Sequence, residues 1–275
     1  MGSRTLAAAA LAAIAVVLAA AVAVAAPNPG RGTTRAGATD PAARADRDWK
    51  PHVAAARRFA RSRKGETRFA IVDERGRLAA HRGGSTVEAA SVIKLMFLVA
   101  YLRMHRDEPI SDADKRILGP MIRESNNAAA EEIEARVGAR RVDELARDAD
   151  MRHFRRSSPY FGLSRISATD WARFMRELDR YVPNRHEDYA KRLLAQIVKR
   201  QRWGIAWEAP RGWRLMFKGG WGVGPGKVQN QVALLERGRR RIGLAILTDA
   251  GRLTAGYKRQ TIAGVTERLL RGLPR

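Results

Sequence analysis

Residues 91–102 read Ser-Val-Ile-Lys-Leu-Met-Phe-Leu-Val-Ala-Tyr-Leu, a run that is almost wholly apolar. A helix of this composition is buried on most of its circumference, so the segment predicts the central helix of the core. Its one charged residue is Lys94, and Ser91 lies three residues earlier. Residues at i and i+3 of a helix share a face, with Cβ atoms about 5–6 Å apart. The segment therefore places one serine and one lysine side by side in a buried setting.

A serine beside a partly buried lysine has the composition of an activated nucleophile. Burial pushes Lys94 towards its neutral form, which can accept the proton of the Ser91 hydroxyl. Free N–H groups and the positive end of the helix dipole also collect where the helix begins, at Ser91. A structural interpretation stays open, because serine is a favoured N-cap and a single lysine can extend its amine out of a buried helix.

Strands are predicted on both sides of this helix, and further helices lie between and around them. The predicted strands are residues 68–72, 77–81, 213–218, 228–235 and 241–247. The predicted helices, besides the one at Ser91, are residues 49–62, 111–122, 128–137, 140–149, 167–178, 187–200 and 255–270. The two strand groups need each other to form a sheet of useful width. We therefore expect an α/β (α+β) fold: a mainly antiparallel five-stranded sheet flanked by N- and C-terminal helices, with an inserted all-helical region.

Composition limits the chemistry available to the chain. There is no cysteine among the 275 residues, which excludes disulfides and thiolate metal sites. The five histidines are scattered, without a ligand pair at helical spacing. We therefore predict no metal and no cofactor.

The charge is strongly basic, with 52 Lys and Arg against 28 Asp and Glu, a net charge of +24. One explanation is a genome rich in G and C, whose codons favour arginine. The functional explanation is a polyanionic neighbour such as nucleic acid, a membrane surface or an anionic cell-wall polymer. No module that stacks bases on aromatic side chains is visible in the sequence.

The N-terminal residues have the pattern of an export signal. Residues 6–26 are continuously apolar after Arg4, and Ala23-Val24-Ala25 offers a small-x-small cleavage site. We predict a signal peptide or membrane anchor over residues 1–26, a flexible linker over 27–47 and one folded domain over 48–275. The expected location is secreted or anchored in the cell envelope, which argues against nucleic acid as a partner.

Two more motifs follow the Ser91 pair along the chain. Ser125-Asn126-Asn127 falls between two predicted helices, and Lys218-Gly219-Gly220 ends a predicted strand just before Trp221. Structural interpretations exist for both, since Ser125 and Asn127 could cap the next helix and the glycines could form a hairpin turn.

The order of the three motifs resembles S-x-x-K, S-D-N and K-T-G of class A β-lactamases and penicillin-binding proteins. The flanking residues 121–129 and the strand order agree with that family, and the similarity covers roughly residues 49–270. The resemblance implies that Ser91 is the acylated nucleophile, Lys94 its base and Ser125 a proton relay to the leaving nitrogen. The substrate-binding residues it implies are Asn127, Lys218, Gly219, Gly220 and Trp221, with the N–H groups of Ser91 and Trp221 forming the oxyanion hole.

The sequence also departs from the family pattern. Asn126 stands where the family usually has Asp, and Gly219 stands where a Ser or Thr hydroxyl usually binds the substrate carboxylate. The loop that carries the family's deacylating glutamate corresponds to residues 151–167, which contain no Asp or Glu. Without that base, water is poorly activated and the acyl-enzyme should persist.

These observations predict an exported serine acyl hydrolase that takes a β-lactam or a peptidoglycan-like small substrate, with an anionic cell-wall polymer or membrane surface as a further partner. One alternative is a non-catalytic cell-wall-binding domain on the same fold. Another is an unrelated basic, membrane-anchored interaction protein in which the three motifs occur by chance.

Overall fold

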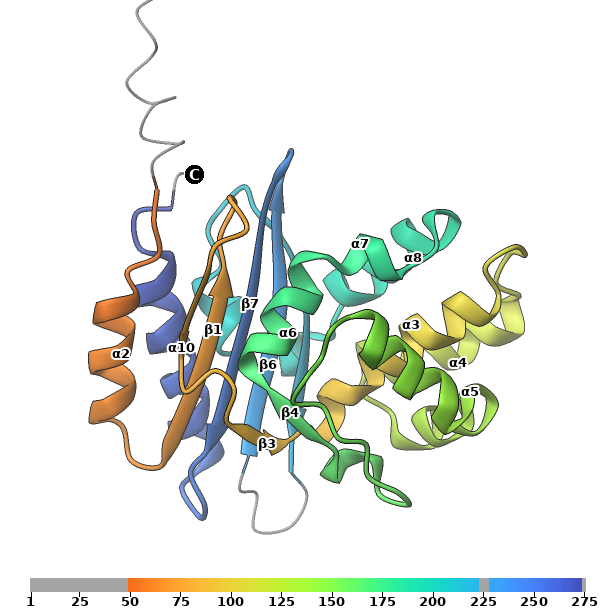
Figure 1. The fold of residues 1–275 in the computed structure, drawn as a ribbon, viewed down its shortest axis with the longest axis horizontal. Helices are drawn as coiled ribbons and strands as arrows, with labels where there is room; N and C mark the ends of the chain where they lie inside the picture. The colour runs from red at the N-terminus through yellow and green to blue at the C-terminus, as the bar shows by residue number, and fades with distance from the viewer. Residues whose placement is uncertain (1–48, 223–227, 274–275) are drawn as a thin grey trace, which may run out of the picture. The chain divides into compact units, whose positions relative to one another are not determined.

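A computed structural model describes residues 49–222 and 228–273. Its centre is a five-stranded sheet with the order β2-β1-β7-β6-β5, and every neighbouring pair is antiparallel (Figure 1). The strands are β1 Glu66–Val72, β2 Leu78–His81, β5 Arg214–Trp221, β6 Val228–Arg237 and β7 Arg240–Asp249. The predicted antiparallel five-stranded sheet is confirmed, and the first strand pair joins the last three through β1 and β7.

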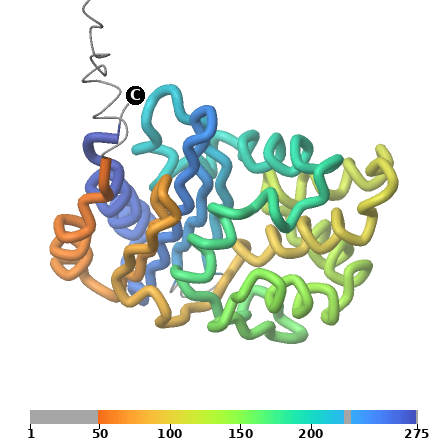
Figure 2. Tube along the Cα trace, turned by 45° about the horizontal axis from the view of Figure 1, so that its top comes forward, coloured from red at the N-terminus to blue at the C-terminus, as the bar shows by residue number. Residues whose placement is uncertain are grey.

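Helices cover both faces of this sheet. The N-terminal helix α2 (Val53–Ser62) packs beside the C-terminal helix α10 (Ala255–Leu270) on one face, while α6 (Ala168–Arg176) lies on the other (Figures 1 and 2). The backbone of α6 comes very close to β7, since a Cβ added to Gly243 would lie 2.1 Å from the carbonyl oxygen of Ala172. Only glycine fits at this contact.

The inserted helical region begins with the apolar stretch that dominates the sequence. Residues 91–93 belong to the short 3₁₀ turn η1 (Ala90–Ile93), which leads directly into α3 (Lys94–Met104). Every α3 residue from Lys94 to Leu102 is buried, as the absence of a polar face predicts. The other helices of this region are α4 Asp112–Arg123, α5 Asn127–Asp148, α7 Leu178–Tyr181 and α8 Asn184–Ala195.

Helix ends follow the capping residues of the sequence. The Ser111 and Ser167 side chains accept the backbone N–H groups of Asp114 and Asp170, which starts α4 and α6 where they are predicted. Gly138 has φ 73° and interrupts α5, so residues 128–137 and 140–149 are separate helical stretches as predicted.

Some elements differ from the prediction. The loop before Ser91 contains β3 (Thr86–Glu88), which pairs with β4 (Arg165–Ser167) in a second, two-stranded sheet. Three-residue strands give too short a pattern to be recognised in sequence. The helix predicted over 187–200 ends at Ala195 and is followed by the 3₁₀ turn η3 (Lys199–Gln201), and the short helix α9 (Ile205–Glu208) is not predicted at all.

The predicted signal or anchor over 1–26 and the predicted linker over 27–47 lie outside the described residues, as does the segment 223–227. Within residues 49–222 and 228–273, no helix is long and apolar enough to cross a membrane.

Candidate active site

Lys94 is the centre of a buried polar group at the start of α3. Its side chain is fully buried, and its Nζ donates to the Ser125 carbonyl oxygen at 2.6 Å, to the Asn127 Oδ1 at 2.6 Å and to the Asn126 carbonyl oxygen at 3.2 Å. Three acceptors match the three donors of an ammonium group. A neutral amine has two N–H donors, which can keep the two 2.6 Å bonds to Ser125 and Asn127. Its lone pair is then available to accept a proton.

Lys218 approaches the same group from the edge strand β5. It is also fully buried, and its Nζ donates to the Ser125 Oγ at 3.0 Å and to the Gly219 carbonyl oxygen at 2.8 Å. Ser125 therefore contacts both lysines, Lys94 through its carbonyl and Lys218 through its hydroxyl. Three segments far apart in the sequence, the starts of α3 and α5 and the end of β5, meet at this residue.

Burial lowers the basicity of both lysines. It lowers the pKa of Lys94 to about 8, although the charge of Glu131 acts in the opposite direction. Burial, reinforced by the charge of Lys94, holds the pKa of Lys218 well below its usual value. Neither lysine has a carboxylate within ion-pair distance in the described part of the chain. Lys94 can therefore act as a base near neutral pH.

Ser91 lies in η1, half-buried, three residues before Lys94. The residue before it, Ala90, has φ 47°, a left-handed conformation that costs free energy for a residue with a Cβ. Ser125 shares this feature, with φ 62°. Strained backbone of this kind is concentrated at functional sites, where surrounding packing holds it.

Strand β5 lies directly against the Ser91 turn. A Cβ on Gly220 would lie 2.8 Å from both the Ala89 oxygen and the Val92 nitrogen, and 2.9 Å from the Ser91 nitrogen. Side chains of a strand alternate between its faces, so Gly220 shares its face with Lys218. The glycine is therefore required for the turn and the lysine to meet.

The strand register gives the direction of the Trp221 N–H. Gly222 donates its N–H to the Val228 carbonyl, so these two residues form a hydrogen-bonded antiparallel pair. The preceding pair, Trp221 and Gln229, is then non-hydrogen-bonded, and the Trp221 N–H points away from β6. Because β5 is the edge strand, this direction is its open side, and η1 is in contact with β5. The N–H groups predicted to form the oxyanion hole therefore belong to two segments in contact.

The loop over residues 151–167 covers the other side of the Ser91 turn. The Ala89 N–H donates to the Ser164 carbonyl at 2.7 Å, and the short turn η2 (Phe161–Leu163) packs on η1. The Phe161 ring centroid lies 6.0 Å from the Lys94 Nζ and 5.4 Å from the ring of Phe97. An aromatic ring, and no carboxylate of this loop, therefore lies beside the lysine.

The structure thus brings together Lys94, Ser125, Asn127 and Lys218, and it places Gly220 against the turn that carries Ser91. Their catalytic roles stay predictions. Asn126 is the helix cap, since its Oδ1 accepts the Ala129 N–H at 2.9 Å, so the capping alternative applies to this residue rather than to Ser125 or Asn127. Gly219 contacts Trp203 on the opposite face of β5. Sequence reasoning missed Phe161, since nothing in the loop pattern indicates which side chain faces Lys94.

A pair of glycine substitutions tests the contact between β5 and the Ser91 turn. We expect Gly220→Ala to lower stability by about 1–3 kcal/mol, because its methyl group would overlap three backbone atoms. Acylation should fall with it. Gly219→Ala is the matched control, because its Cβ would lie 3.4 Å from the nearest atom, in ordinary contact. Thermal unfolding of both variants checks this, and equal losses would contradict the assigned contact.

Among the described residues, no group of three or more His, Asp or Glu side chains could hold a metal ion. The five-stranded antiparallel sheet and its inserted helices match the class A β-lactamase fold. The chain belongs to the beta-lactamase enzyme family, whose family model matches residues 115–273, more than half of the sequence. The matched residues include Ser125, Asn127 and Lys218, whereas Ser91 and Lys94 precede them.

Solved structures share the fold at low sequence identity. A class A β-lactamase from Mycobacterium abscessus is 19% identical, with a TM-score of 0.70 over 82% of this chain and 100% of that chain. A β-lactamase from Sphaerobacter thermophilus is also 19% identical, with a TM-score of 0.68 over 81% and 96%. The L2 structure complexed with relebactam is 17% identical, with a TM-score of 0.67 over 84% and 98%. No curated protein sequence matches the chain.

Proposed function

We propose that the protein is an exported serine acyl hydrolase, acylated at Ser91 by β-lactams or peptidoglycan-type amides, with slow deacylation. The observation that carries the proposal is the buried Lys94 amine, held at 2.6 Å by Asn127 and Ser125 and placed three residues after Ser91. Family membership supports the reaction class. One structure with the same fold, that of L2, contains the small molecule relebactam. We therefore use small molecules, including β-lactams, as probes of this chain.

The proposed acylation uses these groups in turn. The neutral amine of Lys94 accepts the Ser91 hydroxyl proton while the oxygen attacks the substrate carbonyl carbon. The negative charge on the carbonyl oxygen is stabilised by the N–H groups of Ser91 and Trp221. The carbon–nitrogen bond then breaks. Ser125 gives its hydroxyl proton to the leaving nitrogen and receives the proton that Lys94 took from Ser91, so Lys94 is neutral again. The Lys218 Nζ donates to the Ser125 Oγ at 3.0 Å and so holds this hydroxyl in place for the transfer.

Deacylation needs a second base, aimed at a water molecule beside the ester. In this chain the loop over residues 151–167 places the Phe161 ring beside Lys94, and the loop contains no carboxylate. An aromatic ring excludes water and cannot accept its proton. Hydrolysis of the acyl-enzyme is therefore the slow step of the proposed cycle.

The cell envelope is the proposed location, on the basis of the apolar residues 6–26 and the basic charge of the whole chain. Peptidoglycan-type amides and β-lactams both occur there as substrates for an enzyme of this class. The alternative is a non-catalytic cell-wall-binding domain on the same fold. Gly219 has no hydroxyl to offer a substrate carboxylate, so we expect weak binding of small substrates. Absence of any acylation would favour this alternative.

Labelling with a fluorescent penicillin tests the proposal. We expect a covalent fluorescent band for the wild-type chain and none for Ser91→Ala, because the variant has no nucleophilic oxygen. Ser85→Ala serves as the matched control, since Ser85 lies outside the proposed site and should leave labelling unchanged. Labelling that survives in Ser91→Ala would refute Ser91 as the nucleophile, and absence of labelling in the wild type would favour the binding-only alternative.

A further inference from the structure

A cavity of about 430 Å³ lies between the C-terminal part of α5 and the chain segment that follows it. Its floor is apolar and buried, and its rim is unusually rich in arginine. The floor residues are Ala146, Met151 and Phe154, and the rim residues are Asp143, Arg147, Asp150, Arg152, Arg155 and Arg156. Four guanidinium groups face two carboxylates, so the cavity carries an excess of two positive charges.

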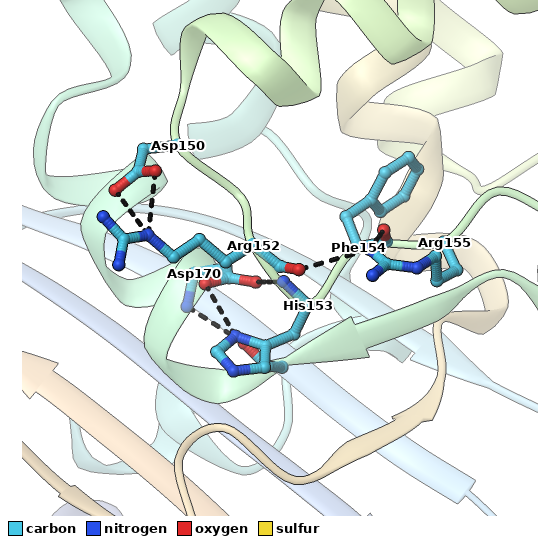
Figure 3. Close-up of polar contacts among 7 residues, drawn as sticks. Asp150, Arg152, His153, Phe154, Arg155 and Asp170 are labelled. Carbon is cyan, nitrogen blue, oxygen red and sulfur yellow. Dashed lines mark hydrogen bonds and ion pairs between the residues drawn. The ribbon is translucent and has the colours of Figure 1, made fainter.

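The two carboxylates are already paired. Asp150 forms an ion pair with Arg152 at 3.0 Å, and Asp143 forms one with Arg156 at 3.5 Å (Figure 3 shows the first of these). No carboxylate in the described ranges lies within ion-pair distance of Arg147 or Arg155. The positive excess of the cavity therefore belongs to these two arginines.

Arg155 is held in position by the backbone. Its Nη1 donates to the carbonyl oxygens of Phe154, at 2.7 Å, and Arg152, at 3.2 Å. Its main chain also pairs with Arg165 through two hydrogen bonds. The other guanidinium nitrogens of Arg155 have no hydrogen-bond partner among the described residues. The Arg155 guanidinium is therefore held in place by the chain itself, with donors left for a ligand.

The segment that carries Arg152 and Arg155 is also held by contacts between His153 and Asp170. Asp170, which is buried at the start of α6, accepts the His153 backbone N–H at 2.8 Å and contacts its imidazole at 3.3 Å (Figure 3). A rigid segment keeps the arginines in place without an ordering cost on binding.

We propose that this cavity binds the phosphate group of a phosphate-ester ligand. Guanidinium groups form paired hydrogen bonds with phosphate oxygens, and two arginines without carboxylates match a doubly charged anion. The apolar floor contacts the organic part of the ester, and the volume is in the range of small-molecule sites. The site is separate from the residues around Lys94, so it does not depend on the proposed catalytic function.

Calorimetric titration of the full chain with phenyl phosphate, a doubly charged phosphate monoester, tests the proposal, and inorganic phosphate is the matched probe without an organic group. The test variant is Arg147→Gln/Arg155→Gln. The matched control is Arg58→Gln/Arg192→Gln, which removes the same charge from two exposed arginines elsewhere. We expect saturable binding that weakens about tenfold or more in the test variant and about twofold or less in the control. Unchanged thermal unfolding of both variants would show that the fold is intact.

Vesicle sedimentation distinguishes a lipid source of the phosphate from a soluble one. Vesicles of phosphatidic acid, a phosphate monoester, and phosphatidylcholine are compared with phosphatidylcholine alone, and a lipid phosphate predicts weaker binding of the cavity variant only to the anionic vesicles. A soluble phosphate ester predicts a difference only in the titrations. Equal weakening of both variants with every probe, or no saturable binding of any, would overturn the proposal and attribute the arginines to overall basic composition.

Discussion

A chromogenic cephalosporin should give a burst of about one product per enzyme molecule, followed by little further hydrolysis. In the proposed cycle Lys94 is the base for acylation, whereas residues 151–167 provide no carboxylate for deacylation. General base assistance contributes typically about 10²–10⁴-fold to a rate, so its loss slows the second step far more than the first. Stopped-flow absorbance at several enzyme concentrations measures the burst amplitude. Rapid, sustained hydrolysis would contradict this prediction and show that another group activates water.

Substitutions at Phe161 test the cause of slow deacylation. Phe161→Glu introduces a carboxylate where the ring now lies 6.0 Å from the Lys94 Nζ, and Phe161→Gln is the matched control without a base. We expect the acyl-enzyme of the glutamate variant to decay about 10²–10⁴-fold faster than that of the glutamine variant. Equal lifetimes would show that the position of Phe161 does not determine the slow step.

Replacement of Lys94 by methionine should reduce acylation by about 10²–10⁴-fold, the contribution of a general base. The change keeps an unbranched side chain in the buried position but removes the amine that contacts Ser125 and Asn127. Lys115→Met is the matched control, since Lys115 is an exposed lysine of α4 that pairs with Asp112. The rate of penicillin labelling gives the comparison, and similar rates for wild type and Lys94→Met would exclude Lys94 as the base.

The pH dependence of the acylation rate independently tests Lys94 as the base. In the proposed mechanism the neutral amine of Lys94 is the active form, and burial lowers the pKa of Lys94 to about 8. Acylation should therefore increase as the pH rises through about 8 and level off above it, because the amine loses its proton there. The residual acylation of Lys94→Met should lack this step.

The elements that sequence predicts best are those with long, strongly patterned stretches. The buried helix at Ser91 has no polar face, and α10 has matching bounds of 255–270 in sequence and structure. Two serine caps set the starts of α4 and α6. The three-residue strands β3 and β4 could not be predicted, because they depend on pairing between segments about 80 residues apart.

At the candidate site, the sequence provides the residue types but not all their surroundings. The contacts of Lys94 with Asn127, and of Lys218 with Ser125, join segments whose motifs could be recognised in order. The role of Gly220 in the approach of β5 to the Ser91 turn depends on a distance between two backbones, which no local pattern contains. The position of Phe161 depends in the same way on how its loop folds over η1.

Formation of a covalent acyl-Ser91 species is the central claim. Intact mass spectrometry after incubation with benzylpenicillin, followed by peptide mapping, tests it most directly. We predict a gain equal to the whole penicillin mass, because ring opening releases no atoms, located on the peptide that contains Ser91 and still present after excess ligand is removed. An unmodified mass at every time point, or an adduct located on another residue, would contradict the claim.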